Sequence, residues 1–157
     1  GMGSLEQCRI LAEDSISSGR AFDKFVEMVE GQGGDSSYVL DTSKFEKAAF
    51  TLEVKAPESG YITDMDTEKC GTAAVVLGAG RKTMESVIDF AAGLKIKAKI
   101  GDRVEQGQTI AALCTNNKES LEEAQRLYLE AVTIGDSKPQ DRLQVMARVD
   151  RNSRTIY

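Results

Sequence analysis

The sequence of 157 residues contains no histidine and only two prolines. Without histidine, it lacks the commonest general base and the commonest metal ligand. Its three cysteines, Cys8, Cys70 and Cys114, are far apart and odd in number, so we expect no zinc ribbon, redox pair or disulfide framework. We expect three reduced, mostly buried thiols in a cytoplasmic protein, with no metal site and no cofactor.

Long apolar runs and an excess of positive charge are also missing. The longest apolar run, Ala73–Leu77, is too short to span a bilayer, and the N-terminus lacks the features of a signal peptide. The formal net charge is -5 and the basic residues are scattered, which disfavours binding to a phosphate backbone. We therefore expect neither a membrane nor a nucleic acid as partner. Gly1 precedes Met2, which predicts a residue left by tag removal and a truncated protein.

The first 35 residues have helical periodicity. Ser4 and Gln7 have the spacing of a capping box, Gly19 interrupts the pattern, and a second helix is expected from Arg20 to Gly31. Two helices could not bury both of their apolar faces against each other and remain a finished domain. Residues 1–35 are therefore interpreted as a helical remnant of a larger lobe, and the polar residues 36–48 as a linker.

From residue 49 the apolar period changes from helical to alternating. Strands are expected around 50–54, 61–65, 94–100, 107–114 and 132–134. A helix capped by Asp66 or Thr67 is apolar on nearly every side, which predicts deep burial, and Ser120 and Glu123 predict a capping box for another. The sequence therefore predicts an α+β domain over residues 49–135, whose two turn-containing halves interlock as a small barrel-like sandwich. The polar tail, residues 136–157, is assigned no structure before Leu143.

Two glycine-containing strings superficially resemble phosphate-binding motifs. In Gly80-Arg81-Lys82-Thr83, Arg81 separates the glycine from the lysine, and Val75 occupies the first glycine position of a P-loop. Gly78-Ala79-Gly80 lacks the third glycine of a dinucleotide fingerprint, and a helix rather than a strand precedes it. We predict instead a helix C-cap that requires a positive φ.

A carrier domain is the alternative interpretation. Residues 56–60 and 101–108 resemble the paired half-motifs of biotinyl and lipoyl domains. Those domains modify a lysine at a hairpin tip, and that position falls near Asn117, one place before Lys118. A shared topology without a swinging arm is predicted, although a stand-alone carrier or interaction module stays open. The acidic side chains are interpreted as solvated surface and helix caps; they are Asp64, Asp66, Glu68, Glu122, Glu123 and Glu130.

Several strings, taken in order and spacing, point to one family. They are residues 18–25, 28–35, 55–62, 65–67, 71–81, 88–89, Gly93 and 101–104. Together they resemble the C-terminal part of pyrimidine-nucleoside and thymidine phosphorylases. The resemblance covers roughly residues 4–135, and the combination is far more specific than any single string. The tail after Lys138 departs from the family's endings.

The resemblance implies a reaction for a longer parent enzyme. Phosphate attacks the anomeric carbon of a pyrimidine nucleoside such as thymidine or uridine, which releases the base and a pentose 1-phosphate. The family's phosphate and base contacts lie in lobes N-terminal to this sequence, so no catalytic or substrate-binding residue is assigned here. The implied partners are those lobes, with phosphate and nucleoside bound through them, in a homodimeric parent. A related phosphorylase of nucleoside monophosphates shares the architecture, which leaves the substrate preference open.

The resemblance also implies an α/β-hammerhead, or barrel-sandwich hybrid, domain preceded by a helical segment of the larger lobe. The loop Gly78–Ser86 is the one candidate functional segment, either closing the cleft or docking onto the other lobes. Its candidate residues are Gly78, Gly80, Arg81, Lys82 and Thr83, and Arg81 is the side chain selected for a docking role. The alternative is an ordinary exposed loop.

Overall fold

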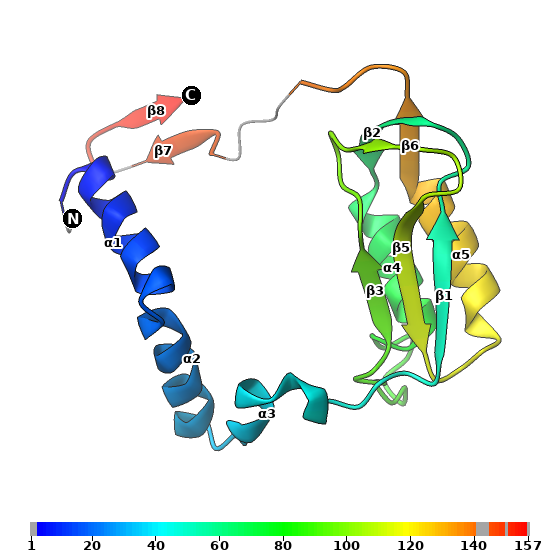
Figure 1. Ribbon diagram of the computed structural model, residues 1–157, viewed down its shortest axis with the longest axis horizontal. Coiled ribbons are helices and arrows are strands. Elements are labelled where there is room, and N and C mark those ends of the chain that lie inside the picture. Colours follow the sequence, from blue (N-terminus) through cyan, green and yellow to red (C-terminus); the bar gives the residue numbers. More distant parts are fainter. Residues whose placement is uncertain (1–2, 141–144, 150, 157) are drawn as a thin grey trace. The chain divides into compact units, whose positions relative to one another are not determined.

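The computed structural model describes residues 3–140, 145–149 and 151–156, with helices and strands that confirm the α+β class (Figure 1). The chain divides into two compact units, and the division falls between Glu46 and Lys47. Each unit is described separately below. In the described part of the chain, every helix is too short or too polar to cross a membrane.

The first unit is helical. It contains α1 (Leu5–Ser17), α2 (Arg20–Gly31), α3 (Ser37–Leu40) and the 3-10 turn η1 (Thr42–Lys44). The predicted capping box of α1 is present, because Ser4 Oγ accepts from the Gln7 amide at 3.3 Å and Gln7 Oε1 accepts from the Ser4 amide at 2.8 Å. Gly19 separates α1 from α2 with a φ of 82°, which a glycine adopts without steric cost.

The apolar stripes of this unit are exposed. Phe22, Phe25 and Met28 on α2 are 47%, 45% and 49% exposed, and none of the four helical segments contains a buried residue. The predicted linker 36–48 is more structured than expected, because α3 and η1 lie within it. Asp35 and Asp41 each accept a backbone N–H two residues ahead, and such contacts by short polar side chains nucleate isolated turns.

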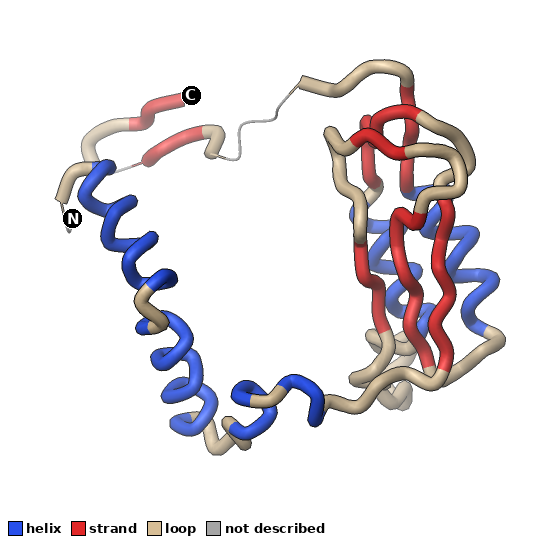
Figure 2. Tube along the Cα trace, viewed as in Figure 1, coloured by secondary structure: helices blue, strands red, loops and turns tan. Residues whose placement is uncertain are grey.

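The second unit contains two three-stranded antiparallel sheets (Figure 2). The first has the order β1-β5-β3, and the second has the order β4-β2-β6. The bounds of the strands are β1 Phe50–Lys55, β2 Gly60–Met65, β3 Gly93–Ile96, β4 Arg103–Val104, β5 Thr109–Thr115 and β6 Val132–Gly135. The alternation predicted to Ile100 ends earlier, at Ile96, where the side chain is 39% exposed.

The two turn-containing segments bond to each other, as the sequence predicts. Ala56 donates its N–H to the Gln108 carbonyl at 2.8 Å, and Gly107 donates back to the Ala56 carbonyl at 2.9 Å. Further along, Ile62 donates to the Asp102 carbonyl at 2.9 Å. These backbone hydrogen bonds join the two turn-containing segments to each other.

Two antiparallel helices, α4 (Thr67–Leu77) and α5 (Ser120–Ala131), lie side by side against the β1-β5-β3 sheet (Figure 1). The core between helices and sheets is apolar and mostly aliphatic; its fully buried large side chains are Tyr128, Ile62, Leu77, Ile110, Leu113, Val54 and Val104. The predicted deep burial of α4 is wrong in extent. Cys70, Ala73 and Leu77 are buried, whereas Ala74, Val75 and Val76 are half-buried, because α4 packs on one side only.

Two further predictions about this unit need correction. Ser120 is the first residue of α5 rather than its cap, and its hydroxyl donates to the Asn117 carbonyl at 2.8 Å, so no capping box with Glu123 forms. Of the three thiols, all of them free, only Cys70 is buried, and Cys8 and Cys114 are half-exposed. The expectation of mostly buried thiols was therefore too strong.

The described structure of the tail lies after Leu143, where the sequence left it open. Strands β7 (Ala147–Val149) and β8 (Arg154–Ile156) pair as a two-stranded antiparallel hairpin. Residues 136–140 form no helix or strand, and the remainder of the segment before Leu143 lies outside the described residues. A lone hairpin buries little apolar surface, which agrees with the 73% exposure of Val149.

Candidate functional site

The predicted loop begins at the C-terminal end of α4. Gly78 has a φ of 109° and caps the helix, with its N–H donating to the Val75 carbonyl at 3.0 Å. The Ala79 amide donates to the Ala74 carbonyl at 3.0 Å, which completes the cap. The predicted positive φ is thus confirmed at Gly78.

Gly80 contributes differently from what the sequence suggested. It is not a residue with positive φ, so it does not share in the left-handed cap. A Cβ atom at this position would lie 2.8 Å from Val75 Cγ2. The glycine therefore allows the chain to pass close over the last turn of α4.

The predicted polar residues lie on the exposed part of the loop. Arg81, Lys82 and Thr83 are all exposed, and no ion pair involves either cation within the described part of the chain. Thr83 instead closes a local turn with Ser86, whose Oγ accepts from the Thr83 amide at 3.0 Å. The loop thus presents two unpaired cations next to a self-contained turn.

Three large apolar side chains in the same region were not among the candidates predicted from the sequence. Met84, Val87 and Phe90 are 90%, 91% and 96% exposed. The loop was predicted to be polar, but from Arg81 to Phe90 it combines cations with these apolar groups. The sequence could have indicated their exposure, because these three residues fit neither the helical nor the alternating pattern. Exposed apolar clusters commonly mark interaction sites.

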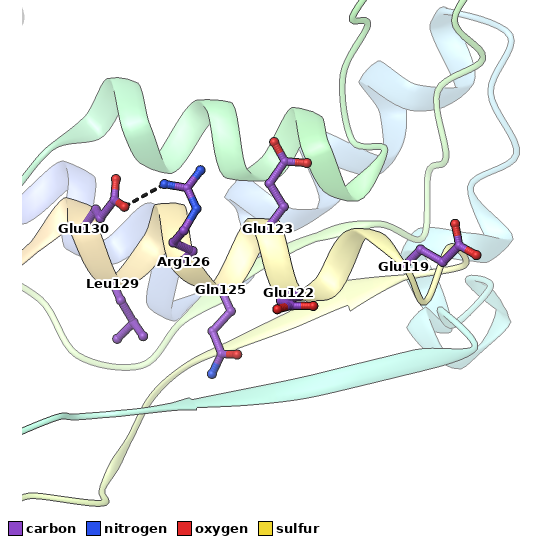
Figure 3. Close-up of a pocket in the computed structure, with 7 residues that line it drawn as sticks. All are labelled: Glu119, Glu122, Glu123, Gln125, Arg126, Leu129 and Glu130. Atoms are coloured by element: carbon purple, nitrogen blue, oxygen red, sulfur yellow. Dashed lines mark hydrogen bonds and ion pairs between the residues drawn. The ribbon is translucent and has the colours of Figure 1, made fainter.

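A shallow hollow lies along α5 (Figure 3). It is lined by Glu119, Glu122, Glu123, Gln125, Arg126, Leu129 and Glu130. Arg126 and Glu130 form an ion pair of 2.7 Å, while Glu122 and Glu123 point to opposite sides of the helix. Paired acid–base chemistry needs two carboxylates that converge on one substrate, which this arrangement does not provide. The acidic residues of α5 are exposed, as predicted.

The described residues contain no site for metal binding, for a swinging-arm lysine or for a phosphate-binding loop. Within those residues, no cluster of three or more metal-ligating side chains is placed to hold an ion. Lys118 lies in the connection between β5 and α5 rather than at the tip of a β-hairpin, which removes the geometry that a swinging-arm lysine requires. The strings of residues 78–80 and 80–83 follow helix α4, so the strand that should precede a dinucleotide fingerprint or a P-loop is also absent.

The second unit is thus an α+β domain in which a glycine-capped loop follows α4. Residues 61–135 match the family described as "Pyrimidine nucleoside phosphorylase C-terminal domain". The resemblance to the C-terminal part of pyrimidine-nucleoside phosphorylases that the sequence predicted is confirmed for these residues.

Three relatives, each named pyrimidine-nucleoside phosphorylase, illustrate the similarity. The protein of Bacillus subtilis is 38% identical over 125 residues, covering 80% of this chain and 29% of the relative. That of Geobacillus stearothermophilus is 39% identical over 125 residues, with the same coverage. That of Staphylococcus aureus is 35% identical over 133 residues, covering 85% of this chain and 30% of the relative. The chain thus spans about three tenths of the length of the curated relatives it matches.

Proposed function

We propose that this chain is the C-terminal accessory domain of a pyrimidine-nucleoside phosphorylase and lacks catalytic residues of its own. In the parent reaction, phosphate displaces the base of a nucleoside such as thymidine or uridine and forms a pentose 1-phosphate. The observation that supports the proposal is the match of residues 61–135 to the family's C-terminal domain, in a chain that spans 29% of a relative such as the Bacillus subtilis enzyme. The catalytic groups belong to the N-terminal lobes of the parent.

The architecture proposed for the second unit is the α/β-hammerhead, or barrel-sandwich hybrid. The hydrogen bonds between its two turn segments support this assignment. In the first unit, α1 and α2 belong to the larger lobe of the parent, and the half-exposed Phe22, Phe25 and Met28 are the side chains which that lobe covers. The parent is a cytoplasmic homodimer that dimerises through its N-terminal lobes.

The proposed role of the loop Gly78–Ser86 is to dock against those lobes as the cleft closes. Arg81 and Lys82 are exposed cations that form no ion pair within the described residues, and the Met84 side chain is 90% exposed. Closure of a loop over a cleft excludes water and strengthens the electrostatic contacts inside it. Gly78 holds the start of the loop through the cap of α4.

A chimeric enzyme tests the assignment. The region of the Bacillus subtilis phosphorylase that matches this chain is replaced by this chain, and phosphorolysis of thymidine and uridine is followed by release of the free base. We expect turnover by the chimera, none by the same enzyme lacking the region, and none by this chain alone. Phosphorolysis by the isolated chain, or a folded chimera without turnover, would contradict the proposal.

The loop is tested in the same chimera by Arg81→Ala and Lys82→Ala. Loss of a docking contact is expected to lower kcat/KM by about tenfold, the effect of one charge-assisted hydrogen bond. Lys118→Ala, which removes an exposed cation from a different connection, serves as the matched control. If the loop variants and the control have the same kcat and KM as the parent chimera, the loop has no role in closure.

A further inference from the structure

The 78–90 segment, defined as residues 78 to 90, is closed at its base by a single aspartate. The Asp89 amide donates to the Gly78 carbonyl at 2.9 Å, so the two ends of the segment are directly bonded. A Cβ atom added to Gly78 would lie 3.3 Å from the Cβ of Asp89, which shows how closely the two residues approach. Asp89 is half-buried, whereas Phe90 beside it is 96% exposed.

The Asp89 carboxylate is fully engaged by backbone and side-chain donors. Its Oδ1 accepts from the Ala91 amide at 2.9 Å and from Asn116 Nδ2 at 3.2 Å. Its Oδ2 accepts from the Asn116 amide at 3.3 Å. A carboxylate that accepts several N–H groups forms charge-assisted bonds, which are stronger than bonds between neutral partners. Asp89 therefore ties the end of the 78–90 segment to the residue that follows β5.

Asn116 extends the connection to a third part of the chain. Its Oδ1 accepts from the Ala49 amide at 2.8 Å, while its Nδ2 donates to Asp89. The orientation of the amide is determined chemically, because only the NH₂ group can donate to a carboxylate and only the carbonyl oxygen can accept from an N–H. Ala49 immediately precedes β1 and lies three residues after the division at Glu46.

We propose that Asp89 and Asn116 form a clasp that holds the 78–90 segment and the entry to β1 in one fixed arrangement. Asp89 is a positioning residue: it places Arg81, Met84 and their neighbours by fixing the base of the segment. Asn116 couples that base to Ala49. The entry to β1 and the segment proposed to dock onto the other lobes therefore move as one element.

The position of Asp89 and Asn116 favours a local role over a general structural one. Asp89 and Asn116 lie outside the buried core cluster, so their loss leaves the packing of that cluster intact. Segments held by a few surface hydrogen bonds open locally, at a free energy well below that of global unfolding. Loss of the clasp is therefore expected to free residues 78–90 and Ala49 together while the domain stays folded.

Backbone amide exchange in this chain, measured by NMR, tests the clasp without reference to enzymatic activity. Asp89→Ala is expected to accelerate exchange of the Ala91 amide and also of the Ala49 amide, each by about tenfold, and Asn116→Ala is expected to do the same at Ala49. The control is Asp102→Ala, which removes a carboxylate that accepts the Lys99 amide at 2.8 Å in another turn. It should leave both rates unchanged. If Asp89→Ala accelerates Ala91 alone, there is no coupling and the clasp is overturned.

The expected effect of the clasp on catalysis rests on the proposed function. The chimeric enzyme distinguishes a failure of the clasp from a failure of that function. Asp89→Ala and Asn116→Ala are expected to lower kcat/KM as Arg81→Ala does, by about tenfold, without a change in the Tm larger than that of Asp102→Ala. If the unsubstituted chimera is inactive, the proposed function fails, and the exchange rates alone decide on the clasp. If the chimera is active and both clasp variants match it, the positioning role is refuted.

Discussion

Thr115, the last residue of β5, donates its hydroxyl to the main-chain carbonyl of Leu77, the last residue of α4, across 2.7 Å. Both side chains are fully buried or nearly so. The last carbonyls of a helix have no partner within the helix, and a buried one needs a donor from elsewhere. The contact joins the end of the central strand to the beginning of the 78–90 segment, and thereby connects the core to the candidate site.

The first prediction concerns that contact. Thr115→Val keeps the shape of the side chain but leaves the Leu77 carbonyl without its donor, so we expect a loss of about 1–3 kcal/mol in the free energy of unfolding. Urea denaturation followed by circular dichroism measures it. Thr133→Val, at an exposed position of β6, is the matched control and should change stability by less than about 0.5 kcal/mol. Equal stabilities for the two variants would mean that the carbonyl finds another donor.

The second prediction contrasts two glycines of the same helix. Gly78 caps α4 with a φ of 109°, whereas Gly71 lies within α4, where an added Cβ meets nothing within 4 Å. Gly71→Ala should therefore stabilise the fold by about 0.5–1 kcal/mol, because alanine loses less backbone entropy in a helix. Gly78→Ala should destabilise it by about 1–2 kcal/mol, because the left-handed conformation is strained for alanine.

Thermal or urea unfolding of these two variants gives the test. Opposite signs for the two substitutions are the essential result, since both make the same chemical change. A stabilised Gly78→Ala variant would show that the cap can rearrange to a conformation with negative φ.

Local patterns in the sequence were sufficient for the parts of the fold that local interactions determine. The capping box at Ser4 and the C-cap at Gly78 involve residues within a few positions of each other, so the spacing alone identified them. Burial of α4 was overestimated, because its sequence is apolar all round but only one face meets other elements. Which face is covered depends on tertiary packing, and no pattern within the helix contains that information.

The same difference between local patterns and long-range contacts applies to the candidate site. The loop itself was found from its glycines and polar residues, but its anchoring at Asp89 depends on Asn116, which is 27 positions further along the chain. At Ser120, by contrast, a local pattern predicted a contact that does not form. Its spacing to Glu123 matched a capping box, yet α5 begins at Ser120 itself, one residue earlier than the pattern requires, and the Ser120 hydroxyl donates to the Asn117 carbonyl. The anchoring of Asp89 thus depends on a distant residue, whereas the Ser120 contact is local.

The third prediction concerns Tyr128, which is fully buried on α5. Burial, with a smaller contribution from Cys70, raises the pKa of its hydroxyl from 10.0 to about 12. Because the pKa is higher in the folded state, the folded state retains the proton more tightly. This contribution to stability is complete below pH 10 and is lost as the pH rises towards 12.

Tyr128→Phe removes the ionisable group and a hydrogen bond to the Ile110 carbonyl that is long, at 3.5 Å. We expect a change of less than about 1 kcal/mol at neutral pH and a smaller loss of stability between pH 10 and 12 than in the unsubstituted chain. Tyr128→Ala should cost about 3–5 kcal/mol, because it leaves a cavity in the core. The measurement is the denaturation midpoint as a function of pH. Identical alkaline profiles for the phenylalanine variant and the unsubstituted chain would refute the assignment.

The fourth prediction concerns Glu53 on β1, whose carboxylate contacts Thr109 on β5 and Lys97, the residue that follows β3. Its carboxylate bonds Lys55 Nζ at 2.7 Å, Thr109 Oγ1 at 3.0 Å and Lys97 Nζ at 3.4 Å. These partners, Lys55 first, lower the pKa of Glu53 from 4.5 to about 2. A carboxyl whose pKa is lower in the folded state contributes stability above its unfolded pKa, and this contribution is lost as the pH falls through the folded value.

Glu53→Gln should therefore lower the Tm at neutral pH, and the difference from the unsubstituted chain should shrink as the pH falls from 4.5 to about 2. Added salt should also reduce it, because ion pairs on an exposed face are screened. Glu58→Gln, on the exposed turn before β2, changes the same functional group without this network and is the matched control. A difference between Glu53→Gln and the unsubstituted chain that stays constant from pH 7 to pH 2 would show that the carboxylate charge contributes nothing, and that the loss comes from altered packing on the sheet.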